Sequence, residues 1–289
     1  MKSFLLLMLA SLFSAYIFAQ DIPVRWEEIV ASDFPKALEK SNKTCILPIG
    51  ILEDHGPRSP IGTDLIHVRS TANFAAEQEY AVIFPNYFFG ETNEARPRPG
   101  TFTQPGKVIW DLLEAICDEI ARNGFDKIVI LNGRGGDPEF LHFFMQSLLN
   151  KRHNYVVYLY EAENDSAYTD EYRKMYESDM KNDQYTGEPE TSVMLYYQPE
   201  LMRMDRITNQ SGANQGLLPL NNLYTPIWWY AAYTDHYPGE EGKASTELGK
   251  FISDHEIASF VKALKEVKLD TKTLQLQNEF YDKVDHLNK

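Results

Sequence analysis

Four short apolar segments constrain the fold more than any other feature of the chain. They lie at residues 44–52, 80–84, 127–131 and 155–160, and each is rich in β-branched or aromatic residues. Segments of this length that are apolar at nearly every position are typical of strands buried on both faces of a parallel sheet. Helical patterns separate them. The sequence therefore predicts an α/β fold, a three-layer α/β/α sandwich with a mostly parallel central sheet.

Helical patterns fill most of the sequence between and after these segments. The predicted helices cover residues 26–40, 64–79, 111–123, 190–200 and 244–265, and another begins at Pro138 with Asp137 as its N-cap. Residues 161–185 are charged and tyrosine-rich, which favours an exposed helical insertion, and a polar tail follows residue 265. The aromatic stretch at residues 212–239 is interpreted as a lid or a subunit contact.

The N-terminus has the pattern of a secretory signal peptide. One basic residue, Lys2, precedes an apolar run from Phe4 to Phe18, and Ala19 supplies a small residue at the expected cleavage point. The run is too short and too poorly flanked for a stable membrane span. We therefore predict a signal peptide at residues 1–19, a single domain at residues 20–289, and a periplasmic or secreted protein.

Net charge limits the expected partners of the protein, and cysteine content limits its expected disulfides. The formal net charge is −14, and lysine and arginine form no cluster. This argues against nucleic acid or an anionic membrane surface and favours a small-molecule or peptide partner. Cys45 and Cys117 are the only cysteines, and their spacing leaves both a disulfide and two packed thiols open.

A carboxylate and an imidazole directly follow the first apolar segment. Glu53 and His55 are two positions apart, so in an extended chain their side chains point to the same side. Asp64 comes shortly afterwards, beyond a turn rich in glycine and proline. Together they form a ligand set suited to zinc, manganese or iron, although such residues at strand ends are also often simply solvated.

Four blocks in the same order resemble the creatininase family of metal-dependent amidohydrolases. They are LPIGILEDHGPRSPIGTD at residues 47–64, FGETNEARPRPGT at 89–101, GFDKIVILNGRGGD at 124–137 and YTGEPETS at 185–192. The first resembles the family signature in which a glutamate, a histidine and an aspartate bind a two-metal centre. The resemblance implies a creatininase-like fold and, more weakly, a homo-oligomer.

This chain departs from the family pattern at three histidines. Arg134 stands where the family has a metal-binding histidine, Tyr185 where it has a histidine that assists proton transfer, and Ala95 where a third histidine follows a glutamate. All three departures fall on the chemistry of the site. The departures therefore affect what the resemblance implies about activity more than what it implies about the fold.

The resemblance implies two metal positions, one of which is altered here. The first would use Glu53, Asp64 and the residue that is now Arg134, whose guanidinium has no lone pair for a metal. The second would use His55, Asp64 and a further carboxylate, either Glu188 or Glu190. The expected metal ligands are His55, Asp64, Glu53 and Glu190, and the expected catalytic residues are Glu53, Arg134, Tyr185 and Glu188.

Arg134 has three interpretations. It replaces the lost ion by pairing with Glu53, it contacts an anionic substrate from the glycine-rich turn, or it is a solvated arginine. His236 is a further candidate for lining the pocket, because it lies in the aromatic stretch. His67, His142 and His153 are predicted to be structural or exposed.

Two functions remain open from the sequence. The first is hydrolysis of a C–N bond in a cyclic or linear amide, with one divalent metal that polarises the carbonyl and a carboxylate that accepts a proton. Tyr185 would replace the proton-transferring histidine, although its high ordinary pKa makes it a poor base. The alternative is a metal-free, catalytically inactive descendant that binds a small ligand.

Overall fold

The computed structural model describes residues 21–136, 138–163, 165–176, 188–206, 212–220, 222–236 and 244–287. Its centre is a sheet of four parallel strands in the order β2-β1-β3-β4. The strands are β1 (Thr44–Ile49), β2 (Val82–Ile83), β3 (Lys127–Asn132) and β4 (Val156–Leu159). Each lies within or overlaps one of the four apolar segments. Every residue of β1 is buried, as expected for a strand covered on both faces.

One face of the sheet packs on α3 (Gly106–Arg122) and α4 (Pro138–Ser147). Leu47 and Ile49 of β1 share a core cluster with Leu113 and Cys117 of α3 and Phe144 of α4. The helix α1 (Phe34–Lys40) packs against the same cluster.

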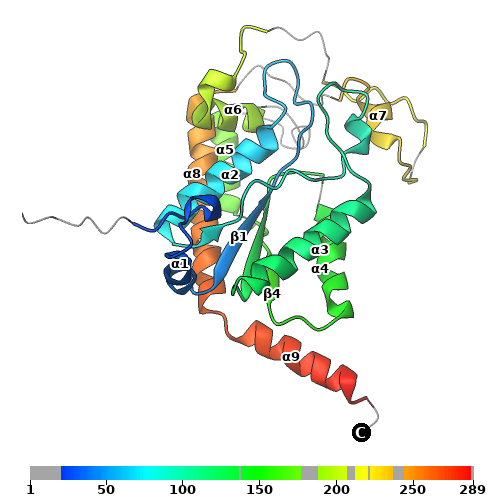
Figure 1. Ribbon diagram of the computed structural model, residues 1–289. Helices are drawn as coiled ribbons and strands as arrows, with labels where there is room; N and C mark the ends of the chain where they lie inside the picture. The colour runs from blue at the N-terminus through cyan, green and yellow to red at the C-terminus, as the bar shows by residue number, and fades with distance from the viewer. Residues whose placement is uncertain are drawn as a thin grey trace, which may run out of the picture.

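The other face packs on α2 (Thr63–Gln78) and α8 (Thr246–Leu269). Ile46 points to this face and joins a second cluster with Val68 of α2 and Phe260 of α8. Figure 1 shows α2 and α8 on one side of the sheet and α3 and α4 on the other. The predicted three-layer α/β/α fold with a parallel sheet is confirmed.

The helix α6 (Glu188–Tyr197) lies against α8 at a point where only glycine fits. A Cβ atom on Gly249 of α8 would lie 1.9 Å from the carbonyl oxygen of Ser192. The two backbones therefore approach unusually closely. This contact fixes the first turn of α6, which carries Glu190.

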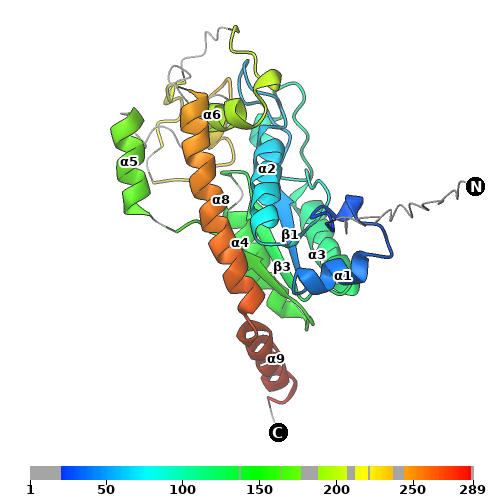
Figure 2. The same cartoon turned by 90° about the vertical axis from the view of Figure 1, so that its left-hand side faces the viewer.

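The remaining helices include expected elements and elements that the sequence did not predict. They are α5 (Ser166–Tyr176), α7 (Trp228–Ala232), α9 (Lys272–Asp285) and the short 3-10 helices η1 (Trp26–Glu28), η2 (Asn93–Ala95), η3 (Leu148–Asn150) and η4 (Pro199–Leu201). The polar tail expected after residue 265 is helical: α8 continues to Leu269, and α9 extends away from the sheet in both views (Figures 1 and 2). The expected insertion contains α5. Every helix in the described ranges is too short or too polar to cross a membrane.

Both cysteines are free thiols buried in the same core cluster. The disulfide that the sequence left open is therefore not formed. Burial raises the pKa of the Cys117 thiol to about 12, and it raises the pKa of the Cys45 thiol well above its ordinary value. Both residues are packed, protonated side chains.

Candidate metal centre

The candidate site lies beyond the carboxyl ends of β1 and β3, where ligand sites of parallel sheets are found. Two glycines bring these strand ends against the first turn of α2. A Cβ atom on Gly50 would lie 2.5 Å from the Cα of Leu65, and one on Gly133 would lie 2.9 Å from the carbonyl oxygen of Asp64. Asp64, the second residue of α2, is therefore placed between the segments that follow the two strands.

His55 is oriented as metal-binding histidines usually are. Its Nδ1 lies 3.1 Å from the backbone carbonyl of Glu53, which can only accept a hydrogen bond, so Nδ1 carries a proton. Its Nε2 lies 3.0 Å from Asp64 Oδ1 and 4.0 Å from Glu190 Oε2. A histidine whose Nδ1–H donates to a carbonyl holds its other nitrogen toward the ligand position.

Two buried carboxylate oxygens at this point have no hydrogen-bond partner in the part of the chain that the structure describes. They are Asp64 Oδ2 and Glu190 Oε2. The Glu190 side chain as a whole is 29% exposed, but this oxygen is buried. One atom from each of Glu53, His55 and Asp64 can be chosen so that all three lie within 4.8 Å of one another. Buried, unsatisfied oxygens beside an imidazole fit a divalent metal ion.

The surroundings raise the pKa values of two members of the cluster, His55 and Glu190. Burial alone would lower the pKa of His55, but the neighbouring Asp64, Glu190 and Glu53 outweigh it and raise the pKa to about 10. Burial, only partly offset by His55, raises the pKa of Glu190 to about 8. Without a metal ion, the site therefore holds extra protons at neutral pH.

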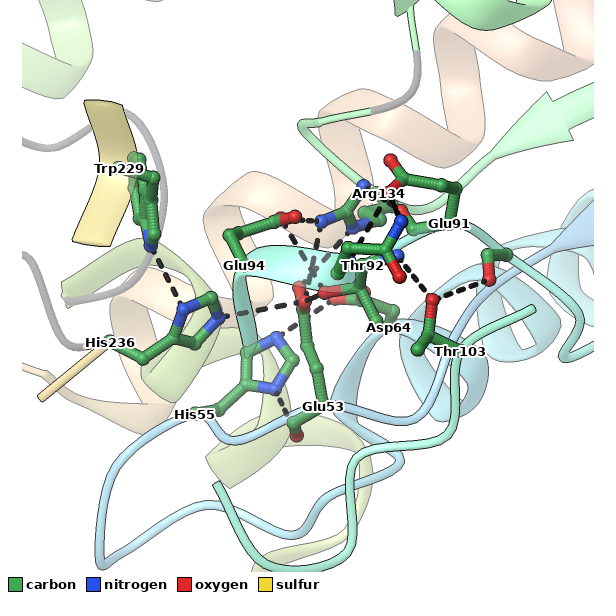
Figure 3. Close-up of polar contacts among 12 residues, drawn as sticks. Glu53, His55, Asp64, Glu91, Thr92, Glu94, Thr103, Arg134, Trp229 and His236 are labelled. Carbon is green, nitrogen blue, oxygen red and sulfur yellow. Dashed lines mark hydrogen bonds and ion pairs between the residues drawn. The ribbon is translucent and has the colours of Figure 1, made fainter. Parts of the chain in front are cut away.

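Arg134 lies at the other side of Glu53, in the turn after β3. Its Nε and Nη2 lie 3.4 and 3.3 Å from the two carboxylate oxygens of Glu53. Nη2 also donates to Glu94 Oε1 at 2.5 Å, and Nη1 donates to the carbonyl oxygen of Glu91 at 2.9 Å. Only 8% of the residue is exposed. Figure 3 shows the guanidinium between Glu53 and Glu94.

Glu53 is thus surrounded by donors. Thr92 Oγ1 donates to Glu53 Oε2, and His236 Nε2 lies 3.6 Å from the same oxygen. Burial alone would raise the pKa of Glu53, but Arg134, followed by His236, His55 and Thr92, lowers it well below its usual range. Glu53 is therefore a carboxylate that stays ionised at neutral pH.

The structure brings together five of the residues singled out from the sequence: Glu53, His55, Asp64, Arg134 and Glu190. Of the two glutamates that the sequence could not separate, Glu190 reaches His55. Tyr185 and the side chain of Glu188 lie outside the described residues, as do Asp137 and the predicted signal peptide.

Two contacts to the centre were missed, those of Thr92 and Glu94. Both lie in the second family-like block, which placed the segment near the site without indicating which side chains contact it. His236 does reach the centre. His67 instead pairs with Glu256, His142 is an exposed partner of Glu161, and His153 is buried, as predicted for structural or exposed histidines.

Comparisons with known proteins identify similar sequences. The sequence is 27% identical over 239 residues to 3-dehydro-scyllo-inosose hydrolase from Thermotoga maritima, a match that covers 74% of this chain and 75% of that protein. It is 21% identical over 260 residues to creatinine amidohydrolase from Pseudomonas putida, which covers 83% of this chain and 95% of that protein.

Solved structures give the same likeness. A manganese form of creatininase matches with a TM-score of 0.72 and 20% identity, covering 86% of this chain and 100% of that one. A Zn-Zn form matches with a TM-score of 0.71 and 20% identity, covering 86% of this chain and 99% of that one. At this identity the structures show a shared fold. The profile of the creatininase family, described as creatinine amidohydrolase, matches residues 27–264, and this protein therefore belongs to that family.

Proposed function

We propose that this protein is exported and hydrolyses a C–N bond in a cyclic or linear amide, either a small molecule or a peptide. The proposed site holds one divalent metal ion through His55, Asp64 and Glu190. The observation that carries this proposal is the convergence of three side chains: His55 Nε2 lies 3.0 Å from Asp64 Oδ1 and 4.0 Å from Glu190 Oε2. Asp64 Oδ2 and Glu190 Oε2 are buried without a hydrogen-bond partner among the described residues. The signal-peptide pattern supports export, and the family resemblance supports a homo-oligomer; both stay predictions.

The donor set of imidazole and carboxylates suits zinc, manganese or iron. The manganese and Zn-Zn creatininases among the related structures support the first two. When bound, such an ion would polarise the substrate carbonyl and lower the pKa of a water molecule. The hydrogen bond from His55 Nδ1 to the Glu53 carbonyl fixes the ring for this task.

We propose that Glu53 pairs with Arg134 and does not bind the metal ion. The guanidinium would replace the ion that the first metal position holds in the family, because it supplies positive charge to Glu53 and Glu94. Contact of Arg134 with an anionic substrate is disfavoured, since the guanidinium is buried and already bonded to protein oxygens. Glu188 at the start of α6 and Tyr185 stay the candidates for proton transfer.

One observation favours the alternative of a metal-free protein that binds a small ligand. The buried charges already form pairs, His55 with Asp64 and Arg134 with Glu53 and Glu94. Because these charges are already paired, the site can fold without a metal ion. Metal content therefore separates the two functions.

Elemental analysis should find about one divalent ion per wild-type chain purified without chelators or a metal-affinity column. Glu190→Gln should lower metal affinity by more than about 100-fold, because even residues that only support metal ligands contribute 10–100-fold. Glu256→Gln is the matched control, since that carboxylate bonds His67 outside the proposed ligand set. A wild-type chain that binds none of zinc, manganese or iron would contradict the hydrolase and favour the metal-free protein.

Metal binding should also release protons and strengthen as pH rises. His55, with a pKa of about 10, and Glu190, with a pKa of about 8, both hold a proton at neutral pH in the metal-free site. Ligands must lose their protons to bind a metal, so each proton released raises affinity about tenfold per pH unit below these pKa values. Calorimetric titration in buffers of different ionisation enthalpy measures the released protons. Zinc binding without proton release near neutral pH would refute this assignment.

A further inference from the structure

Trp229 and His236 form a buried pair beside Glu53, on the segment that contains α7. The indole Nε1 of Trp229 lies 2.9 Å from His236 Nδ1, and both residues are more than nine-tenths buried. On its other side, His236 Nε2 lies 3.6 Å from Glu53 Oε2. Figure 3 shows the three side chains in a row from α7 to the centre of the site.

The indole determines which nitrogen of His236 carries the proton. An indole N–H can only donate, so His236 Nδ1 must offer a lone pair. A neutral imidazole has a single N–H, which here lies on Nε2 and faces Glu53. A nitrogen that carries a proton has no lone pair for a metal ion.

The two histidines of the site therefore differ in which nitrogen the surrounding protein keeps protonated. His55 donates from Nδ1 to a backbone carbonyl, so its Nε2 is the nitrogen that can bind an ion. His236 accepts at Nδ1 from Trp229, so its Nε2 is a donor. On either side of Glu53, one imidazole thus presents a nitrogen that can bind an ion, and the other presents an N–H donor.

The backbone of His236 is held in an uncommon conformation. Its φ angle is +56°, in the left-handed region that few residues other than glycine adopt. Its N–H donates to the carbonyl oxygen of Tyr233 at 2.9 Å, and the Tyr233 ring packs on Trp229 with centroids 4.9 Å apart. Such a conformation persists only when its surroundings impose it, and it is common at functional sites.

We propose that Trp229 and His236 are a positioning pair that fixes an N–H donor toward Glu53. Together with Arg134 and Thr92, this donor contacts the Glu53 carboxylate oxygens that a metal ion would otherwise use. Neither residue lies in the four family-like blocks. The inference deepens the proposed metal centre and rests on it for the assignment of ligands, but the tautomer follows from the contacts alone.

Nuclear magnetic resonance of protein labelled with ¹⁵N-histidine tests the pair in chelator-treated protein. His236→Asn identifies the signals by their loss, and asparagine tolerates a positive φ. In the wild type, Nδ1 of His236 should resonate as an unprotonated nitrogen and Nε2 as a protonated one. Trp229→Phe should abolish this distinction by letting the proton exchange between the two nitrogens.

Trp228→Phe is the matched control, because it removes the neighbouring indole N–H, which bonds Tyr224 at the surface. It should leave the His236 signals unchanged. A proton on Nδ1 in the wild type, an imidazolium, or an unchanged tautomer in Trp229→Phe would overturn the proposal. The wild-type spectrum decides the tautomer even if Trp229→Phe does not fold. Because no metal or substrate is present, this outcome is independent of whether the protein is a hydrolase.

Discussion

Arg134→Met should lower the free energy of unfolding by about 3–5 kcal/mol, the usual result of removing one partner from a buried ion pair. The side chains of Arg134 and Glu53 are only 7% and 11% exposed, and Arg134 also bonds Glu94. Methionine matches the length of the arginine stem but supplies neither charge nor donors. Two carboxylates would then lie close together without a cation. Urea unfolding in the presence of a chelator measures the loss without a contribution from metal binding.

Arg122→Met is the control for this experiment. Arg122 pairs with Glu119 within α3, but the two side chains are 67% and 61% exposed. Exposed pairs contribute less than about 1 kcal/mol. The loss in Arg134→Met should shrink at acid pH, because the ion pair depends on ionised Glu53, whose pKa lies well below its usual range in the wild type. Equal, small losses in both variants would show that Arg134 does not neutralise Glu53.

The sheet could be predicted because its strands satisfy a local rule. Residues 44–52 and 127–131 are apolar at nearly every position, which is typical of strands buried on both faces, and the structure places β1 and β3 side by side there. Their order in the sheet, β2-β1-β3-β4, was not predicted, because the apolar pattern of a segment does not indicate which segment lies beside it. The boundaries moved: α3 begins at Gly106, five residues before the predicted start.

The C-terminal helix was missed because its stabilising contacts are distant in sequence. Tyr281 is its only buried residue, and the Tyr281 hydroxyl donates to the carbonyl oxygen of Leu148 at 3.0 Å. Gln277 donates to the carbonyl oxygen of Tyr155 at 2.9 Å. A helical spacing is present at Leu276, Phe280 and Val284, but the charged residues around these positions weaken the pattern. A helix held by one face against a remote segment leaves little local signal.

The candidate site was predictable to the extent that its residues share a motif. Glu53, His55 and Asp64 come from one block that follows one strand, so their proximity follows from the chain itself. Glu94 reaches the same centre from the short 3-10 helix η2 and His236 from the segment after α7, both distant in sequence and without a periodic pattern that fixes a side chain. The contacts of Glu94 with Arg134 and of His236 with Glu53 therefore needed the three-dimensional structure, whereas the pairing of Arg134 with Glu53 was one of the interpretations open from the sequence.

Arg134→His should raise the metal content from about one to about two ions per chain, because an imidazole restores a lone pair at the first metal position. Glu53, which now faces the guanidinium, would become available as a ligand together with Asp64. Elemental analysis and zinc titration measure the gain, with Arg134→Gln as the control that removes the charge without supplying an imidazole.

The result of Arg134→His also bears on the second set of donors around Glu53. Thr92 and His236 still face its carboxylate after Arg134 is replaced. If Arg134 alone excludes the ion from the first metal position, Arg134→His is enough to restore metal binding there. If metal content stays unchanged in Arg134→His but rises when Trp229→Phe is added, the indole keeps the site closed by holding the proton of His236 on Nε2. No gain in either variant would contradict the idea that a lost metal position persists beside Glu53.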